Sequence, residues 1–485
     1  MELVNVAKTE KGGEAPARAV LVRPWLWVAA LTVFAACLRA IGIAKGLWWD
    51  EIYFLMITVR HPLANIVTTF PADTQHPLYS ILARLSVVAF GEHAWSLRLP
   101  ALLFGVASIP VLYLLASSVA SRIEALLATA LLTVSYHHVW FSQNARGYTA
   151  LAFWTLLSTY LLLRGIETGR RGFYLAYGAA VALGIYTHLT MMFLVAAHLL
   201  ICACLAVDAA RKGAEKWRFP LQGFLLGGAL TLLFYAPILS QVRNFFLHRP
   251  SPMRAVSTPR WALWETVRGL VLGLGSQGVL LLAGVVVLAG AWTYFKQNRT
   301  VFAMFALPGA MTAMGAVLSR GTMYPRFYFF LIGFAVLILI RGVFVIPNWI
   351  GAPRLAAVLA CALMAASAYS LIRNYRYPKQ DYEGAIQFVD ALKKDGEVVV
   401  TAGATTYPMS HYFAKPWESV ETAGRLEEIC RRGRPVWLVY TFPRYLEAAV
   451  PGSLEVIKKE FTVVRVFPGT VGDGDVFVAK SGRIL

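Results

Sequence analysis

The sequence predicts a polytopic helical membrane protein that carries a small α/β domain at its C-terminal end. Of its 485 residues, 58% are hydrophobic and only 15% are charged, and the mean hydropathy is +0.58. A soluble enzyme does not have so apolar a composition, so much of the chain requires lipid as its solvent. From residue 374 onward the composition becomes that of a soluble domain, which sets off the second part.

The first part contains apolar runs that are long enough to cross a bilayer. A helix needs about 20 such residues to span the hydrocarbon core, and on this criterion we predict about eleven spans. The first run has no small-residue cleavage site, so we interpret it as a retained signal anchor. The runs begin near Trp25, Leu99, Ala125, Tyr148, Phe173, Thr190, Leu221, Gly273, Val301, Phe327 and Pro353.

Lysines and arginines in the short loops predict the orientation. They gather at the N-terminus and around residues 164–171, 211–218 and 296–299, and the positive-inside rule makes that side cytoplasmic. The outer face then carries Asp50, the turn at residues 143–148 and the C-terminal domain, so in a bacterium the protein is a multi-pass inner-membrane protein with these parts in the periplasm. The basic segment from Arg243 to Arg268 also falls outside. Either the span count is off by one there, or its arginines serve an anionic ligand.

The net charge of +19 indicates the positive-inside bias and attraction to anionic lipid headgroups, and we predict no nucleic-acid partner. We divide the chain into a transmembrane part, residues 1–373, and an outer α/β domain, residues 374–485. The domain is long enough for its own core. Hydrophobic patterning predicts helices at residues 379–392 and 420–431 and strands at residues 397–402, 436–441, 461–467 and 476–479.

A long loop, at about residues 46–98, joins the first two spans, and it begins with two adjacent carboxylates. Asp50 and Glu51 follow Trp48 and Trp49, whose rings would hold the backbone at headgroup depth. Carboxylates gain nothing from burial at such a place, so their presence indicates a functional site. The alternative is a solvated helix end anchored by aromatic residues. Apolar residues elsewhere in the loop favour short helices in the interface plane.

The order of several short motifs resembles the GT-C superfamily of membrane glycosyltransferases. Nearly the whole chain takes part, and each motif alone is weak. The chain looks most like the bacterial branch related to family 39, which includes protein O-mannosyltransferases and the lipid A aminoarabinose transferase. The motifs are Trp48-Trp49-Asp50-Glu51, His76-Pro77-Leu78-Tyr79, Ser142 to Tyr148, Tyr186-Thr187-His188 and Tyr324-Pro325-Arg326-Phe327-Tyr328.

The resemblance implies a reaction at the outer face. Members of the superfamily take a sugar from a polyprenyl-phosphate carrier and use an aspartate of the first outer loop at the catalytic centre. The chain departs from its relatives at three positions: an acidic residue often stands where this chain has Asn144, a second proline where it has Leu78, and tyrosine where it has Phe327. These departures leave the reaction class standing and leave the substrate open.

Such chemistry assigns roles to the residues of the motifs. Asp50 is the candidate base for an attacking hydroxyl, with Glu51 as the second catalytic candidate. Arg146 and Arg326 would hold the departing phosphate through paired hydrogen bonds, although both could instead reach for lipid headgroups. We predict further substrate contacts from Asp73, His76, Tyr79, Gln143, Tyr148, His188 and Tyr324.

No cofactor is required by the spacing. A divalent cation such as Mg or Mn could be held by Asp50, Glu51 and His76, with Asp73 as a fourth ligand. The predicted partners are a polyprenyl-phosphate sugar, membrane lipids and an exported acceptor that is a lipid, a glycan or a protein.

Two other classes of function share these features. A transporter or flippase of lipid-linked sugars would show two structural repeats with broken helices and charged residues at mid-membrane. The sequence has no such internal symmetry, and its ionisable residues cluster at one interface. A membrane scaffold with an outer binding domain would tolerate loss of Asp50.

Overall fold

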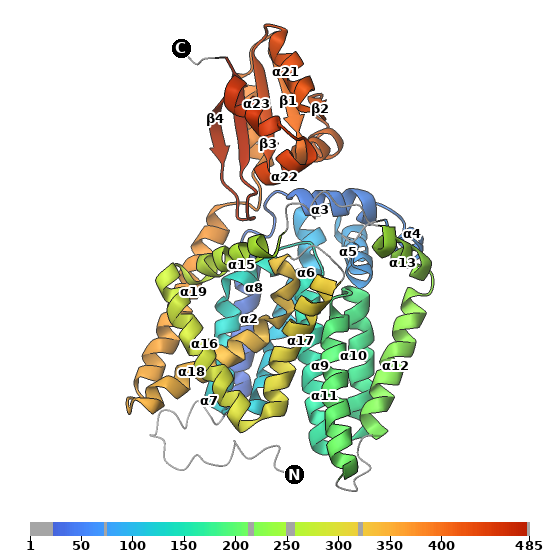
Figure 1. The fold of residues 1–485 in the computed structure, drawn as a ribbon, viewed down its shortest axis with the longest axis vertical. Helices are drawn as coiled ribbons and strands as arrows, with labels where there is room; N and C mark the ends of the chain where they lie inside the picture. Colours follow the sequence, from blue (N-terminus) through green and yellow to red (C-terminus); the bar gives the residue numbers. More distant parts are fainter. Residues whose placement is uncertain (1–22, 72–74, 212–217, 249–257, 319–323, 483–485) are drawn as a thin grey trace.

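The computed structural model describes residues 23–71, 75–211, 218–248, 258–318 and 324–482. These residues form a helical bundle and a sheet domain, stacked along the long axis of the molecule (Figure 1). Between the two lie the short helices of the first long loop, so this loop contacts both parts.

The bundle consists of long helices that run along the same axis. Each of the eleven predicted apolar runs corresponds to one of them. The helices are α2 (Pro24–Ala40), α6 (Ala94–Val119), α7 (Arg122–Val134), α9 (Tyr148–Thr168), α10 (Arg171–Thr187), α11 (Met191–Arg211), α12 (Arg218–Tyr235), α16 (Gln277–Gln297), α17 (Arg299–Leu318), α18 (Ile332–Trp349) and α19 (Leu355–Arg376).

The number of spans stays a prediction. Within the described residues, seven helices are long and apolar enough to cross a membrane, or eight if the bent pair formed by α12 and α13 (Leu239–His248) is one span. The shortfall arises because α2 and α10 have 17 residues each and α7 has 13. These helices fall below the length that a straight crossing requires.

The basic segment lies at the end of the bundle that faces the sheet domain. Figure 1 shows α13 and α15 (Pro259–Leu274) at this end. Arg268 in α15 pairs with Asp473 of the sheet domain at 3.3 Å and with Glu265 at the same distance. Arg249 and Arg254 of the segment lie outside the described residues. Part of the segment therefore contacts the sheet domain.

The first long loop forms four short helical segments at the same end. They are α3 (Trp49–Phe54), the π-helical turn η1 (Leu55–Val59), α4 (Leu63–Thr68) and α5 (Pro77–Phe90). Proline starts α5 at a position where its missing N–H costs nothing. Because α3 is the segment nearest the sheet domain in Figure 1, Asp50 and Glu51 lie at the junction of the two parts.

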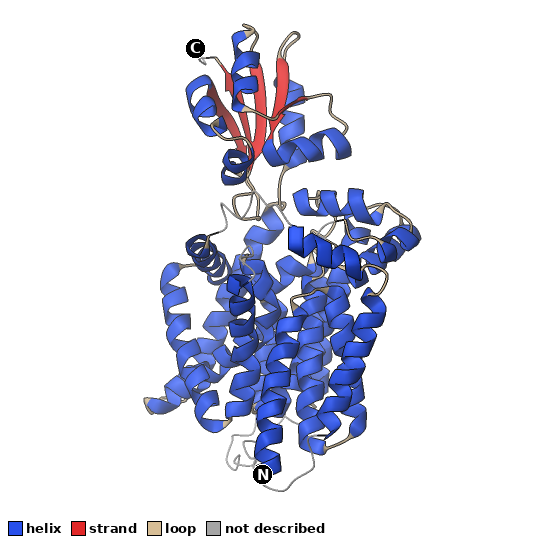
Figure 2. Cartoon of the chain, turned by 45° about the vertical axis from the view of Figure 1, so that its right-hand side comes forward, coloured by secondary structure: helices blue, strands red, loops and turns tan. Residues whose placement is uncertain are grey.

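The sheet domain has five strands in the order β2-β1-β3-β5-β4. Strand β1 pairs in parallel with β2 and β3, whereas β5 pairs antiparallel with β3 and β4. Figure 2 shows helices on both sides of the strands. The elements are α20 (Tyr382–Leu392), β1 (Val398–Ala402), η3 (Gly403–Thr405), η4 (Pro408–Tyr412), β2 (Glu418–Val420), α21 (Ala423–Arg431), β3 (Val436–Thr441), α22 (Pro443–Ala449), α23 (Ser453–Glu460), β4 (Phe461–Phe467) and β5 (Val476–Ser481).

This architecture confirms the predicted fold class and the four predicted strands. The predicted helix at residues 420–431 begins three residues later, because Val420 ends β2. Sequence patterning missed β2, α22 and α23, which have three, seven and eight residues. Elements of one or two turns are too short for a periodic pattern to form.

One face of the sheet shares a hydrophobic core with the first long loop. Alternate residues of the strands point to opposite faces. Trp437 and Val439 of β3 belong to a buried cluster that also contains Ile52 and Phe54 of α3 and Tyr79 of α5. The opposite face is covered by a separate cluster that includes residues of α21, α22 and α23. The sheet domain is therefore packed onto the helix that carries the two carboxylates.

Candidate functional site

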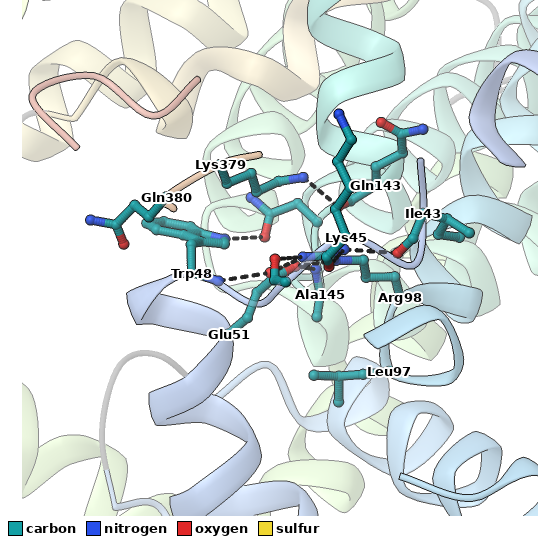
Figure 3. Close-up of polar contacts among 12 residues, drawn as sticks. Ile43, Lys45, Trp48, Glu51, Leu97, Arg98, Gln143, Ala145, Lys379 and Gln380 are labelled. Carbon is teal, nitrogen blue, oxygen red and sulfur yellow. Dashed lines mark hydrogen bonds and ion pairs between the residues drawn. The ribbon is translucent and has the colours of Figure 1, made fainter. Parts of the chain in front are cut away.

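Glu51 lies in a fully buried ion pair at the start of α3. Its two carboxylate oxygens accept hydrogen bonds from Nε and Nη2 of Arg98 in α6, at 2.8 and 2.5 Å. The backbone N–H of Ala145 donates to the same carboxylate at 2.7 Å, and that of Trp48 donates at 3.4 Å (Figure 3). Burial by itself raises the pKa of Glu51, but the attraction and hydrogen bonds of Arg98 outweigh it, so the pKa lies below its usual value.

Arg98 distributes its remaining donors over the backbone. Nη1 donates to the carbonyl oxygens of Ile43 and Lys45, and Nη2 donates to that of Gly46. The pair therefore ties together the chain before α3, the start of α6 and the turn that contains Ala145. Glu51 has no exposed surface and its oxygens already accept four hydrogen bonds. These contacts favour a positioning role for Glu51, and its catalytic role stays a prediction.

Asp50 points to a different partner from its neighbour. Its Oδ2 accepts a hydrogen bond from Nη1 of Arg326 at 2.9 Å. The Arg326 guanidinium lies over the ring of Tyr324, 4.5 Å from its centroid, and Trp261 of α15 meets that ring at 5.7 Å. Arg326 belongs to the 3-10 turn η2 (Pro325–Leu331). The structure thus brings together Asp50, Tyr324 and Arg326 from the first and the last of the motifs.

A second cluster gathers around His76, the residue before α5. The Nδ1 atom of His76 accepts a hydrogen bond from the backbone N–H of Gly147 at 2.8 Å. The ring packs against those of His188 and Tyr148, with centroids 4.5 and 5.6 Å away. Burial, reinforced by His188 and then by Arg146 and Arg326, holds the pKa of His76 well below its usual value. The imidazole is therefore neutral at physiological pH.

Several polar atoms of this second cluster are buried, and none of them has a hydrogen-bond partner among the described residues. They are Nε and Nη1 of Arg146, Nε2 of His76 and the hydroxyl of Tyr148. Buried polar groups normally have partners, because an unpaired group loses its hydration without compensation. Arg146 is only 4% exposed, and its guanidinium lies 5.9 Å from the centroid of the Tyr148 ring. The cluster is suited to an anionic, hydrogen-bonding ligand.

The turn that carries Arg146 needs glycine at position 147. A Cβ atom there would lie 2.6 Å from Nδ1 of His76 and 3.1 Å from Cγ2 of Thr187. We predict that Gly147→Ala lowers the free energy of unfolding by about 1–3 kcal/mol, since the added methyl overfills a packed site. Thermal unfolding of the purified protein measures this loss.

Gly228→Ala in α12 is the matched control, because a Cβ atom there would meet nothing within 4 Å. It should leave stability unchanged or raise it slightly, since alanine favours helix. Equal melting temperatures for the two variants would contradict the close approach of Gly147 to His76.

Two predicted substrate residues have structural roles. The Tyr79 hydroxyl donates to the carbonyl oxygen of Leu97 at 2.9 Å. The Gln143 amide donates to the carbonyl oxygens of Arg39 and Ile41, and its oxygen accepts from Asn374. Both side chains are buried and hydrogen-bond to other elements of the protein, and their substrate contacts stay predictions. Asp73 lies outside the described residues.

Two of the three predicted metal ligands, Glu51 and His76, have hydrogen-bond partners within the protein. Glu51 gives its oxygens to Arg98 and Ala145, and His76 gives Nδ1 to Gly147. In the described part of the chain, no three His, Cys, Asp or Glu residues are grouped so that they could hold a metal ion. The predicted site for Mg or Mn stays a prediction.

Sequence reasoning missed three residues that hold the site together, namely Arg98, Lys379 and Gln380. The Nζ atom of Lys379 donates to the carbonyl oxygen of Gln143 at 2.5 Å (Figure 3). Gln380 accepts from the backbone N–H of Trp49 at 2.9 Å. No local motif marks these residues, because their partners lie between 47 and 331 positions away in the sequence.

Part of the chain is similar in sequence to known proteins. A family model described as dolichyl-phosphate-mannose-protein mannosyltransferase matches residues 73–240. A relative described as the putative mannosyltransferase YkcB of Bacillus subtilis is 27% identical over 136 residues, which are 28% of this chain and 19% of that protein. The matched region thus spans about a fifth of the relative's length.

Solved structures match nearly the whole chain. ArnT from Cupriavidus metallidurans, in a structure bound to undecaprenyl phosphate, has a TM-score of 0.54 at 15% identity and covers 97% of this chain and 99% of its own. The Archaeoglobus fulgidus oligosaccharyltransferase has a TM-score of 0.51 at 14% identity and covers 93% of this chain and 72% of its own. This is the GT-C fold.

The GT-C fold confirms the resemblance that the motifs predict. The family model and the relative are both described as mannosyltransferases, which supports the transferase interpretation over the transporter. Multiple spans make the chain a membrane protein.

Proposed function

We propose that this chain is an integral membrane glycosyltransferase that moves a sugar from a polyprenyl-phosphate donor to an exported acceptor. The acceptor is a lipid, a glycan or a protein, and the reaction takes place on the outer face of the bacterial inner membrane. The sheet domain then lies in the periplasm and the N-terminus in the cytoplasm. Support comes from the family model and from the solved neighbours, one of which is bound to undecaprenyl phosphate.

One observation carries the proposal. The buried guanidinium of Arg146 has N–H donors without partners among the described residues. It shares a site with the carboxylate of Asp50, which pairs with the guanidinium of Arg326. The two clusters adjoin, because the ring of His188 lies 6.1 Å from that of Phe327, over which the Arg326 guanidinium lies. Transfer from a lipid phosphate needs both an acceptor for a proton and donors for a phosphate.

The proposed reaction is a single inverting displacement. The acceptor hydroxyl attacks the anomeric carbon, the bond from that carbon to the phosphate oxygen breaks, and the hydroxyl proton passes to a carboxylate oxygen of Asp50. The departing phosphate gains negative charge, which Arg146 and Arg326 stabilise through paired N–H donors. Tyr148, His76 and His188 form the polar and aromatic wall next to Arg146, with Tyr324 beside Arg326.

Arg146→Lys tests the phosphate role. Lysine keeps the charge but loses the planar fork of donors, and we expect transfer to fall by about 10- to 100-fold, the worth of one or two charged hydrogen bonds. Mass spectrometry of envelope glycolipids and glycans from a deletion strain complemented with each variant measures this. A glycan species should lack one sugar, while the polyprenyl-phosphate sugar accumulates.

Arg431→Lys is the matched control, since Arg431 lies on the surface of α21 with 78% of its side chain exposed. It should restore the glycan fully. If a strain that lacks the wild-type chain shows no glycan change at all, the transferase proposal fails. If Arg146→Lys restores the glycan as well as wild type does, the phosphate role fails.

A further inference from the structure

The short linker between α19 and α20 reaches into the site from outside the bundle. Gln380 is 1% exposed, and its Oε1 accepts the backbone N–H of Trp49 at 2.9 Å. Trp49 is the first residue of α3. The first N–H groups of a helix have no partner within the helix, so they need an outside acceptor. The side chain of Gln380, in the linker, therefore accepts the first backbone N–H of the helix that carries Asp50.

The other end of the Gln380 amide is fixed to the sheet. Its Nε2 donates to Oγ1 of Thr441 at 3.0 Å, and that hydroxyl donates to the carbonyl oxygen of Asp475 at 2.9 Å. Thr441 is the last residue of β3 and has no exposed surface. A single buried amide thus joins the start of α3 to the end of a central strand.

Lys379, the preceding residue, holds the other half of the site. Its Nζ donates to the carbonyl oxygen of Gln143 at 2.5 Å and lies 5.0 Å from the centroid of the Trp140 ring. Gln143 begins the turn that leads to Arg146. Burial, with repulsion from Arg98 second, lowers the pKa of Lys379 to about 7, and the amine can donate this hydrogen bond in either protonation state.

The backbone of the linker is itself clamped by the sheet domain. The N–H of Thr470 donates to the carbonyl oxygens of Pro378 and Lys379 at 3.0 and 3.1 Å. Gly469 permits this approach, because a Cβ atom there would lie 2.3 Å from the Lys379 oxygen. The linker therefore cannot shift without moving the loop between β4 and β5.

We propose that Lys379 and Gln380 are positioning residues through which the sheet domain sets the distance between Asp50 and Arg146. Gln380 fixes the helix of Asp50, and Lys379 fixes the turn of Arg146. The inference rests on the proposed function, in which the base and the phosphate-binding arginine act on one donor molecule. A displacement of about 1 Å between such groups costs about 100-fold in rate.

The variants separate positioning from mere stability. Gln380→Ala removes both hydrogen bonds of the amide, to Trp49 and to Thr441. Lys379→Met removes the hydrogen bond to Gln143 but keeps an aliphatic side chain of similar length. Gln380→Glu keeps an acceptor for the Trp49 N–H. Glu397→Gln is the matched control, because its carboxylate also accepts two side-chain hydrogen bonds, from Trp437 and Lys480, in a half-buried place just before β1. The start of β1 pairs with the start of β3, whereas Thr441 lies at the far end of β3.

The first measurement is hydrogen exchange of the full-length protein in nanodiscs, followed by mass spectrometry of peptides that cover residues 48–54 and 143–148. We expect Gln380→Ala to speed exchange in the first peptide by about tenfold or more, since its helix start loses an acceptor, and Lys379→Met to do so in the second. Gln380→Glu should restore protection. Glu397→Gln should leave both peptides unchanged even if it lowers the melting temperature.

The second measurement is transfer in the complemented strain at equal protein level. Gln380→Ala and Lys379→Met should each lower sugar transfer by about tenfold, and the variant that combines them by about 100-fold. Glu397→Gln should transfer as well as wild type. Variants that lower the melting temperature but change neither exchange nor transfer would overturn the inference. Exchange does not depend on transfer, so absence of transfer by the wild type would refute the proposed function and not the coupling.

Discussion

Asp50→Asn is expected to lower sugar transfer by about 100- to 10,000-fold, the range that a positioned general base contributes. Asparagine keeps an oxygen that can accept from Nη1 of Arg326, at the position where Asp50 accepts at 2.9 Å, so the fold should persist. It cannot take the proton of an attacking hydroxyl. The measurement is the envelope glycan profile of a deletion strain complemented at matched protein levels.

Asp390→Asn provides a control of the same chemistry. Asp390 forms an ion pair with Lys415 at 2.6 Å on the surface of the sheet domain, with 47% of its side chain exposed, and exposed pairs contribute little. This variant should restore the glycan completely. Full restoration by Asp50→Asn would instead refute the role of Asp50 as base and favour a scaffold.

The fold was largely predictable because its signals are local. Each of the eleven apolar runs and four strand patterns lies within the residues of a single element, and each corresponds to a helix or strand in the structure. The span count was not predictable to the same degree. Helices such as α7, with 13 residues, need neighbours to complete a crossing, and no window of sequence contains those neighbours.

The sequence predicts only those site residues whose side-chain type and motif indicate a role. Asp50, Arg146 and Arg326 stand in motifs, and the structure brings Asp50 and Arg326 within 2.9 Å of each other. Glu51 looks like Asp50 in sequence, yet it faces Arg98, because consecutive residues of a helix point in directions about 100° apart. Both side chains are buried, and which of the two pairs with Arg98, 47 residues away, is information that the pattern alone cannot supply.

The Glu51 ion pair leads to the largest expected effect on stability. Glu51→Gln keeps the shape of the side chain but leaves the buried guanidinium of Arg98, only 1% exposed, without its counter-charge. Breaking such a pair costs about 3–5 kcal/mol. We expect the purified variant to unfold at a markedly lower temperature than wild type, measured by thermal unfolding at pH 7.

The double variant Glu51→Leu with Arg98→Met removes both charges, and it should recover part of the loss, because no charge is then buried without its counter-charge. Recovery should be incomplete, since the carbonyl oxygens of Ile43, Lys45 and Gly46 lose their Arg98 donors. The pKa of Glu51 is lowered in the folded protein, so its contribution is present above its ordinary pKa of about 4.5 and is lost as pH falls through the folded value. The gap in melting temperature between wild type and Glu51→Gln should therefore narrow below pH 4.5. A gap that stayed constant with pH would show that shape rather than charge makes Glu51 necessary, and the start of α3 would then depend on packing against the sheet domain.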